Sequence, residues 1–391
     1  MISRKLIAIK KYVISDDGKE RILVALSGGV DSAVTAALLK EYGHDVTGVY
    51  VKTWEHENDI LGECPGAVDL RDARSVSEKL QIKFLVVNFV DFYRKEVVAP
   101  MVQGYKLGIT PNPDVICNRV MKFGALLEYA EQNGFSAIAT GHYCKRIKTR
   151  NSPAQLWEGN DKNKDQSYFL AKINQDQLEK ARFPLGEIEK SKVREIAKKM
   201  GLSVAEKKDS QGICFLGKVK ISEFLSNFID DEPGSIVTVD GKIVGEHKGL
   251  HRYTLGQRRG IGVPSNVDNE NFVVTGKNES TNELIVAFEN VRESTLWGRR
   301  YVVESLSFLS QPIDAEVRLL GKTRYRDPSV DLTYRPLGNN KAEIIFDSPQ
   351  RALTPGQVLA LYEGERLIGG GTYSHHSLGR ADISFMSEVS A

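Results

Sequence analysis

Residues 27–32 read Ser-Gly-Gly-Val-Asp-Ser and restrict the fold of this chain more than any other feature of its sequence. The apolar run at 21–26 precedes them and is predicted as a strand. A helix is predicted at 32–42, because apolar side chains recur there at helical spacing and Gly43 supplies a stop. Two glycines allow a tight turn, and N–H groups at a helix start face oxyanions. The sequence therefore predicts a cradle for phosphate or pyrophosphate between strand and helix.

This loop differs from the two commoner phosphate-binding motifs. It has neither the Gly-Lys-Ser/Thr of the Walker sequence nor the dinucleotide pattern Gly-x-Gly-x-x-Gly. A plain glycine turn with a Ser or Asp cap is the structural alternative. The pattern Ser-Gly-Gly-x-Asp-Ser is similar to the loop of the N-type ATP pyrophosphatases. That resemblance implies that ATP is cleaved between its α and β phosphates and that a carbonyl oxygen is adenylated.

The same resemblance implies a set of nucleotide-binding residues. Val51, at the end of the second predicted strand, would contact adenine through its backbone, and Gly141 would lie beside the nucleotide. Asp31 would help to hold Mg²⁺, which bridges phosphate oxygens through carboxylates and waters. The residues assigned to ATP are Ala25, Leu26, Ser27, Gly28, Gly29, Val30, Asp31, Ser32, Val51 and Gly141.

Strands and helices alternate along the first half of the chain. Strands are predicted at 21–26, 45–51, 84–89 and 137–142, with helices at 32–42, 68–80 and 122–132. Strands that are apolar almost throughout, in such an alternation, imply a parallel sheet covered on both faces. The predicted fold class is α/β with a doubly wound, mostly parallel sheet, and it resembles the adenine nucleotide α-hydrolases.

The pattern changes twice further along the chain. Residues 146–228 read as mixed turns and short helices, the clearest helix being at 190–200. Short β-rich runs follow Pro233, at 235–239, 242–244, 272–275, 283–287, 315–319 and 342–346. Such runs suggest small antiparallel barrels or sandwiches. We predict a catalytic domain at 1–228, whose part from about 146 onward contacts tRNA, a central β-rich domain at 229–297 and a β-barrel-like domain at 298–391.

The chain has four cysteines, and their spacing contains no Cys-x-x-Cys pair. This argues against a zinc site and against a secreted disulfide scaffold, so free thiols in a reducing compartment are expected. No resident metal site is predicted. For Cys64 and Cys144 the expected role is that of a small buried hydrophobic residue.

The other two cysteines lie in distinctive loops. Cys117 ends Thr-Pro-Asn-Pro-Asp-Val-Ile-Cys at 110–117, where two prolines stiffen the chain and Asp114 precedes the thiol by three residues. Cys214 follows Lys-Lys-Asp-Ser-Gln-Gly-Ile at 207–213, and nearby cations raise the thiolate fraction of a thiol. Either thiol alone could be a buried hydrophobe, but together with the phosphate loop these motifs resemble those of the ATP-dependent tRNA 2-thiouridylases.

Membership of that family would define a reaction. The resemblance implies that the C2 oxygen of the wobble uridine, position 34, is adenylated and then replaced by sulfur, giving 2-thiouridine, AMP and diphosphate. Cys214 would carry a persulfide, and Cys117 would resolve it by forming a catalytic disulfide. Asp114 would act as general acid or base near the target base. ATP is the co-substrate, with Mg²⁺; the partners would be the tRNAs for Lys, Glu and Gln and a persulfide donor, either a cysteine desulfurase or a relay protein.

Contacts with RNA are assigned largely by the same resemblance. The segments 164–169 and 322–326 each combine cations with aromatic rings, which suits phosphate contact and base stacking. Each basic cluster alone could equally be a solvated face, and His142 could face tRNA or simply close its strand. The residues assigned to tRNA or the target base are Asn112, Pro113, Asp114, His142, Lys164, Asp165, Gln166, Arg324, Tyr325 and Gln357.

Composition limits the remaining possibilities. Fifty-three basic against 51 acidic residues give a net charge of +2, so any RNA contact rests on local patches. No apolar run approaches the roughly 20 residues that a membrane-spanning helix needs. Residues 1–20 lack the features of a secretory signal, and whether they form another targeting extension stays open. A cytoplasmic enzyme is expected.

Two other classes of protein remain compatible with these motifs. An amide-forming ligase could use the same adenylating loop without needing a thiol. A non-catalytic RNA-binding protein could retain a relict nucleotide pocket, although the intact hexamer at 27–32 weighs against that alternative. Release of AMP driven by a small carboxylate without tRNA would favour the ligase.

Overall fold

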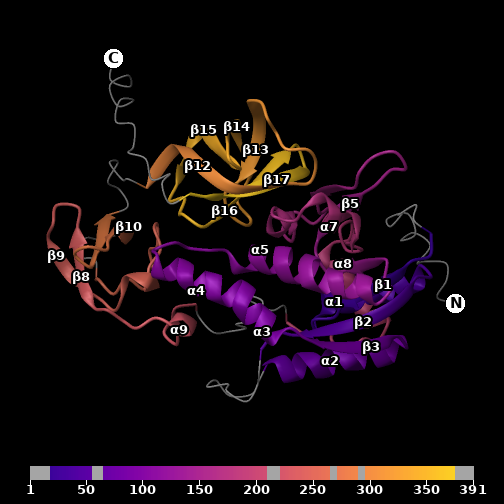
Figure 1. Cartoon of the computed structure of the whole chain (residues 1–391). Coiled ribbons are helices and arrows are strands. Elements are labelled where there is room, and N and C mark those ends of the chain that lie inside the picture. The colour runs from indigo at the N-terminus through magenta and orange to yellow at the C-terminus, as the bar shows by residue number, and fades with distance from the viewer. Residues whose placement is uncertain (1–17, 55–64, 209–220, 265–270, 289–295, 375–391) are drawn as a thin grey trace.

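The computed structural model describes residues 18–54, 65–208, 221–264, 271–288 and 296–374. The assignments made to Cys64 and Cys214 lie outside these residues. Along the described chain a parallel sheet with its helices comes first, a small β domain second and a barrel third (Figure 1). The predicted fold class, an α/β domain followed by two β-rich domains, is confirmed.

The first domain is built on a five-stranded sheet in the order β3-β2-β1-β4-β7, and every neighbouring pair in it is parallel. Its strands are β1 Arg21–Ala25, β2 Asp45–Lys52, β3 Lys83–Asn88, β4 Ala137–Ala139 and β7 Ala181–Arg182. The strand order reverses between β1 and β4. In open sheets of this kind, ligands bind at such a reversal, beyond the carboxyl ends of the strands.

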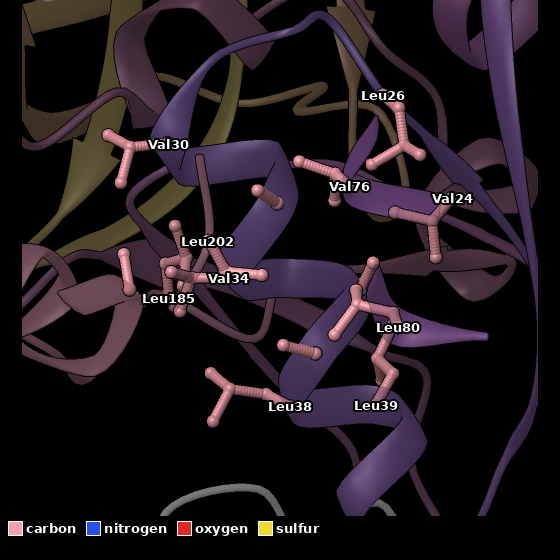
Figure 2. Packing of buried hydrophobic residues seen from close by; sticks show 14 of the residues in the cluster. Val24, Leu26, Val30, Val34, Leu38, Leu39, Val76, Leu80, Leu185 and Leu202 are labelled. Carbon is pink, nitrogen blue, oxygen red and sulfur yellow. The ribbon is translucent and has the colours of Figure 1, made fainter. Parts of the chain in front are cut away.

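Helix α1, Val30–Glu41, is buried along most of its length. It lies against the sheet between α2, Pro65–Leu80, and α8, Lys190–Lys199, and all three contribute to one hydrophobic cluster. Figure 2 shows Val34 of α1 beside Leu185 and Leu202. Because α1 is covered on both sides, its first turn is held rigidly at the carboxyl end of β1.

Between β3 and β4 the chain forms a series of helical segments, and the later ones pack against the opposite face of the sheet. The segments are α3 Val90–Tyr93, a π-helical turn at Arg94–Val98, α4 Ala99–Lys106, α5 Pro113–Cys117, a second π-helical segment at Asn118–Ala125, and α6 Leu126–Gln132. The helix predicted at 122–132 is confirmed, although its beginning is π-helical. In Figure 1, α4 and α5 run beneath the C-terminal barrel.

The C-terminal barrel is closed by six strands. Their order is β12-β15-β14-β13-β16-β17, and β12 pairs again with β17. The bounds are β12 Trp297–Phe308, β13 Val317–Lys322, β14 Val330–Gly338, β15 Lys341–Arg351, β16 Val358–Glu363 and β17 Arg366–Tyr373. A barrel-like domain was predicted; only β13 and β15 correspond to strands identified in the sequence.

The central domain is a four-stranded sheet in the order β10-β11-β8-β9. Its strands are β8 Gly234–Thr238, β9 Ile243–His247, β10 Phe272–Asn278 and β11 Glu283–Phe288. Strands were predicted at all four places, with ends that differ by a few residues. Among the described helices of the whole chain, none is both long and apolar enough to cross a bilayer.

One part of the sequence interpretation is wrong. Residues 146–228 were read as turns and short helices, but β5, Cys144–Ile147, and β6, Gln155–Glu158, form a hairpin that joins the C-terminal sheet. The partner of β6 is β17, through Leu156 opposite Leu367. Two four-residue strands give little periodicity, and a partner over two hundred residues away leaves no local signal.

Candidate nucleotide and thiol site

The loop at 27–32 follows the carboxyl end of β1 and carries a series of unpaired backbone N–H donors. Within the described residues, the five backbone N–H groups of residues 28–32 have no hydrogen-bond partner. Gly29 is the extended N-cap residue of α1, so these groups stand at the positive end of a helix dipole. Unpaired donors that converge at a helix start are suited to phosphate oxygens.

Gly28 and two serine hydroxyls fix the shape of this loop. Gly28 has a φ of +72°, and a Cβ atom there would meet the backbone of Asp69, so only glycine fits. The Oγ of Ser32 accepts from Ser27 N at 3.1 Å and donates to Gly29 O at 3.1 Å. The cradle is thus braced by its own side chains before any ligand binds.

Gly141 and Val51 lie near the loop, as the nucleotide assignment requires. A Cβ atom on Gly141 would stand 2.9 Å from the Cβ of Asp31, so the turn after β4 packs against the first turn of α1. Strand β4 accordingly ends at Ala139, three residues earlier than predicted. Val51 is half-buried near the end of β2 and packs against the hydrophobic cluster that contains Cys117.

Asp31 does not stand alone in the loop. Both of its carboxylate oxygens accept from Lys190 Nζ, at 2.7 and 2.8 Å, and Oδ1 also accepts from the Tyr143 hydroxyl at 2.7 Å. Lys190 is the first residue of α8 and is only 9% exposed. The carboxylate at the nucleotide site is therefore oriented and neutralised by residues far away in sequence.

Lys207 contacts the loop from its other side. Its Nζ donates to the backbone oxygen of Gly28 at 3.0 Å and to Asp69 Oδ1 at 2.7 Å, and it also pairs with Asp72. Both carboxylates belong to α2. Lys207 precedes the segment with Cys214 in the sequence, so the described chain reaches that segment directly from the phosphate loop.

Cys117 is the last residue of α5 and is 1% exposed. Asn112 caps this helix by accepting from Val115 N at 3.1 Å, and Pro113 occupies its first position, where a missing N–H has no cost. Asp114, one turn before Cys117, is half-buried. The proline-rich sequence thus builds a short capped helix that presents carboxylate and thiol together.

The segment at 109–112, which leads into the helix that ends at Cys117, is also held by the C-terminal barrel. Thr110 N donates to Pro355 O at 2.9 Å, and Gly356, with a φ of +87°, packs so closely on Ile109 and Thr110 that a Cβ would collide. Gln357 follows directly, and its buried Oε1 has no hydrogen-bond partner among the described residues. Gln357 therefore lies where the barrel meets the loop that carries Asn112 and Pro113.

Two further residues assigned to RNA lie at the same junction. The Tyr325 ring is 4.5 Å from that of Phe169, and Arg324 donates to the backbone oxygens of Arg351 and Ala352 at 2.8 and 2.7 Å. Arg324 keeps a side-chain exposure of 37%. The structure brings these barrel residues close to the segment at 164–169, as a common RNA surface would require.

Asp165 has an internal position instead. It is 6% exposed and accepts from Gly159 N at 3.0 Å, from the Ser167 hydroxyl at 2.9 Å and from Lys322 Nζ at 3.1 Å. Gln166 next to it pairs with the Tyr143 backbone, accepting from its N–H at 3.1 Å. The Asp165 carboxylate thus joins the first domain to the barrel, whereas Lys164 is half-exposed; the assignment of both residues to tRNA stays a prediction.

His142 is likewise internal. Its imidazole is 8% exposed, lies 2.7 Å from the Thr140 hydroxyl through Nδ1, and contacts the rings of Phe123 and Phe183. Burial, and then the charge of Lys122, lower the pKa of His142 well below its usual value. This agrees with the alternative that His142 closes the strand end, and its assignment to tRNA stays a prediction.

The most important residues that the sequence interpretation missed are partners of the loop. Tyr143, Lys190, Asp69 and Asp72 were given no role, although Tyr143 adjoins the assigned His142. Each belongs to a predicted element or its flank. Because the fold alone brings them to the loop, no local pattern could have revealed them.

A doubly wound sheet with a phosphate cradle at its strand reversal defines the class of nucleotide-binding α/β enzymes, and the comparison with known families agrees. A model described as "tRNA methyl transferase HUP domain" matches residues 20–218. A "tRNA methyl transferase PRC-barrel domain" model matches 222–288, and an "Aminomethyltransferase beta-barrel domain" model matches 299–373.

Curated relatives identify the family more narrowly. The tRNA-specific 2-thiouridylase MnmA of Akkermansia muciniphila is 47% identical over 353 residues, covering 90% of this chain and 98% of that protein. Its namesake from Streptococcus thermophilus is 42% identical over 361 residues, covering 92% and 96%. This chain belongs to the family of tRNA-specific 2-thiouridylases. A solved NMN synthetase from Francisella tularensis is 20% identical over 56% of this chain and 76% of its own, with a TM-score of 0.34, too low to support an argument.

Proposed function

We propose that this protein thiolates tRNA, replacing the C2 oxygen of the wobble uridine at position 34 by sulfur at the expense of ATP. The observation that carries the proposal is the position of Val51, which packs on the Cys117 cluster and lies two residues beyond Val49, the partner of Ala25 where β1 enters the phosphate loop. A nucleotide held by the loop would therefore lie next to a thiol. The family to which the chain belongs is named for this activity.

The nucleotide half supplies a leaving group. The C2 oxygen of uracil leaves poorly, so it first attacks the α phosphorus of ATP, releasing diphosphate and leaving the base as an adenylate. The free N–H groups of residues 28–32 would hold the phosphate oxygens, and Val51 and Gly141 would border the adenosine. Fixed donors aimed at developing charge stabilise such a step because they need no reorganisation.

The residues present fit a Mg²⁺ ion that arrives with ATP. Among the described residues no group of three or more His, Cys, Asp or Glu side chains could hold a metal, so phosphates and waters would provide most of the ligands. Asp31 is the carboxylate at the loop, and Lys190 and Tyr143 hold its oxygens in place. Mg²⁺ would neutralise charge on the phosphates.

The thiol half supplies the sulfur. The terminal sulfur of a persulfide on Cys214 attacks C2 and expels AMP. The Cys117 thiolate then attacks Cys214 Sγ, which leaves sulfur on the base as a thiocarbonyl and forms a Cys117–Cys214 disulfide. A thiol reductant supplies two electrons to restore both thiols. Asp114, one helical turn from Cys117, would move the proton.

The position of Cys214 along the chain supports this role. Lys207, seven residues before it, is bound to the phosphate loop, and Phe224 of α9, Ile221–Leu225, packs in the cluster that contains Cys117. Before Cys214 the described chain is therefore held at the phosphate loop by Lys207, and after Cys214 it resumes in α9, which packs on the Cys117 cluster. A persulfide between them would need to come within about 3 to 3.5 Å of the activated carbon.

The target base must leave its stack to enter such a site. Half-exposed Lys164, with Gln166, Arg324, Tyr325 and Gln357, would form the RNA surface where barrel and first domain meet. The target base would lie against Asn112, Pro113 and Asp114. The substrates would be the tRNAs for Lys, Glu and Gln in the cytoplasm, with sulfur from a cysteine desulfurase or a relay protein.

The second candidate is tRNA methyl transfer, the activity named in the descriptions of the matching family models. A methyl donor needs neither an ATP-cleaving cradle nor paired thiols, so the described loop favours thiolation. The products differ as well: thiolation exchanges oxygen for sulfur on the base, whereas methylation adds a methyl group.

One experiment tests the proposal. Several unmodified tRNAs are incubated with the protein, Mg-ATP and a persulfide source, and their nucleosides are analysed by high-resolution mass spectrometry. We expect 2-thiouridine and AMP in equal amounts, both dependent on tRNA. Cys117→Ser and Cys214→Ser should each abolish 2-thiouridine formation but keep ATP binding. Cys144→Ala, the control at a buried thiol, should still form 2-thiouridine. A methylated base, or thiolation without either thiol, would overturn the proposal.

A further inference from the structure

Lys207 gathers three oxygen atoms beneath the phosphate loop. The backbone oxygen of Gly28 lies 3.0 Å from its Nζ and Asp69 Oδ1 lies 2.7 Å away, with an Asp72 oxygen as the third acceptor. All three donor positions of an ammonium group can thus be satisfied. The side chain is 28% exposed. Its location is therefore specified by the protein itself and not by solvent.

The bond to Gly28 O has a consequence for the neighbouring residue. A trans peptide is planar, so the C=O of Gly28 and the N–H of Gly29 point in opposite directions. A lysine that holds the oxygen on one side therefore directs the N–H of Gly29 to the other side. That N–H is one of the five without a partner in the described chain.

The Gly28–Gly29 peptide needs the contact with Lys207 to keep one orientation. Gly28 and Gly29 are consecutive glycines, and Gly28 has a positive φ of 72°. Glycine pairs allow a peptide plane to flip at little steric cost. A flipped plane would aim a carbonyl oxygen at the phosphates, where it would repel them. Without an external contact the cradle would lose a donor and gain an unfavourable acceptor.

The charge of Lys207 is retained where it stands. Burial would lower the pKa of its ammonium group, but the hydrogen bonds it donates to Asp69 and Asp72, together with their negative charges, outweigh burial and raise the pKa. The group is thus a permanent donor and not a nucleophile. Its two carboxylate partners keep it beneath the loop, because their attraction opposes any movement of the ammonium group toward the phosphates.

We propose that Lys207 is a positioning residue for ATP cleavage, which holds the Gly28–Gly29 peptide with its N–H directed at the bound phosphates. The inference rests on the proposed function, because it assumes that the loop binds ATP. It differs from the role of Lys190, which holds the side chain of Asp31 and not the backbone.

Two variants and two ligands test this role. Lys207→Met keeps the aliphatic stem and removes the donor; Lys198→Met is the matched control, since Lys198 is 56% exposed and pairs with the exposed Glu206. The dissociation constants of Mg-ATP and of adenosine are measured by calorimetry for each. Losing a hydrogen bond to a charged donor should weaken Mg-ATP binding in Lys207→Met roughly tenfold or more. Adenosine binding and the control should change less than about twofold, because adenosine has no phosphate for the loop to hold.

The outcomes separate this inference from the proposed function. Unchanged Mg-ATP binding in Lys207→Met, or an equal loss for ATP and adenosine, would overturn the positioning role while thiolation by the unaltered protein still stood. A native protein that binds no ATP would overturn both. If Lys207→Met fails to fold, Asp72→Asn, which loosens the lysine without removing it, should give a smaller loss confined to ATP; an equal loss for adenosine would count against the inference.

Discussion

Gly141 lies directly against Asp31: a Cβ atom on the glycine would stand 2.9 Å from the Asp31 Cβ and 3.0 Å from the Ser32 backbone nitrogen. Side-chain methyl groups do not approach other atoms so closely, and part of what they would meet is backbone. The turn after β4 and the first turn of α1 are thus in contact without room for one more carbon atom. The nucleotide cradle depends on that contact for its position.

Replacing Gly141 by alanine should therefore displace the loop. We expect Gly141→Ala to destabilise the protein by about 1–3 kcal/mol, the usual cost of overpacking, and to weaken Mg-ATP binding roughly tenfold. Calorimetry and urea denaturation measure the two effects. Gly276→Ala is a suitable control, because the nearest atoms to a Cβ there all belong to the Ile285 side chain, the first being its flexible Cδ1 at 3.3 Å. ATP affinity equal to that of the unaltered protein would show that the contact is not needed.

The pair formed by Lys190 and Asp31 makes a second prediction. The side chain of Lys190 is 11% exposed and that of Asp31 is 33% exposed. Lys190→Met should therefore leave a partly buried carboxylate without its cation and cost about 1–2 kcal/mol of unfolding free energy. The double variant Lys190→Met with Asp31→Asn should recover most of that stability, yet should not recover ATP cleavage. Denaturation curves of the four proteins give the coupling energy. No coupling between the two positions would refute the assigned ion pair.

The two reactive thiols should become joined during the reaction. After a single turnover without added reductant, we expect peptide mapping under non-reducing conditions to find a Cys117–Cys214 disulfide in proportion to the 2-thiouridine formed. Cys144 should stay reduced, because burial, and then the charge of Asp165, raise the pKa of its thiol and keep it protonated. A linkage that includes Cys144, or product without any linkage, would contradict the assigned roles.

The junction between the first domain and the barrel should depend on Lys322. Its Nζ lies 2.7 Å from Glu158 Oε1 and 3.1 Å from Asp165 Oδ2, and all three side chains are nearly buried. Lys322→Met would remove the cation that the two carboxylates share, leaving Glu158 only its exposed partner Lys162, so we expect a loss of about 3 kcal/mol at neutral pH. Lys341→Met, which removes an exposed barrel ion pair with Glu304, should cost less than about 1 kcal/mol. Urea denaturation measures both variants.

The same network predicts a pH dependence. Burial would raise the pKa of Glu158, but hydrogen bonds and charges from Lys162 and Lys322 outweigh it and lower the pKa. The resulting stabilisation is fully present above the usual value of 4.5 and is lost as the pH falls through the lowered pKa. The difference in stability between the native protein and Lys322→Met should therefore shrink in acid. A difference that stays constant from pH 7 to pH 3 would refute the contribution assigned to Glu158.

Local sequence was sufficient for the parts of the site whose chemistry is local. The hexamer at 27–32 shows its glycines and hydroxyls in order. The segment ending at Cys117 was interpreted as a stiffened loop and is a short helix, although the cap residue Asn112 and the first-turn Pro113 are local signals for it. The contacts of Asp31 with Tyr143 and Lys190 have no such local signal, since they depend on the packing of α8 against α1. A lysine at a helix start looks the same whether it faces water or a carboxylate.

Two residues assigned to RNA have surroundings that the sequence did not indicate, for the same reason. Asp165 stands between a cation and an amide in a segment that suits RNA, and its partners Gly159, Ser167 and Lys322 enclose it. His142 likewise follows a strand at the site, yet Phe123 and Phe183 enclose it. Both residues were interpreted from neighbours in sequence, and both are controlled by neighbours in space.

The pairing of β6 with β17 determines how this chain can be divided. Protein expressed only as far as the central domain would leave β6 as an open sheet edge and uncover Leu156, which the barrel residue Leu367 normally shields. Such a fragment is expected to self-associate through that edge instead of behaving as an autonomous catalytic unit. The barrel thus closes an edge that the first domain leaves open, and because the barrel is translated after the first domain, the site is completed only once the barrel has been made.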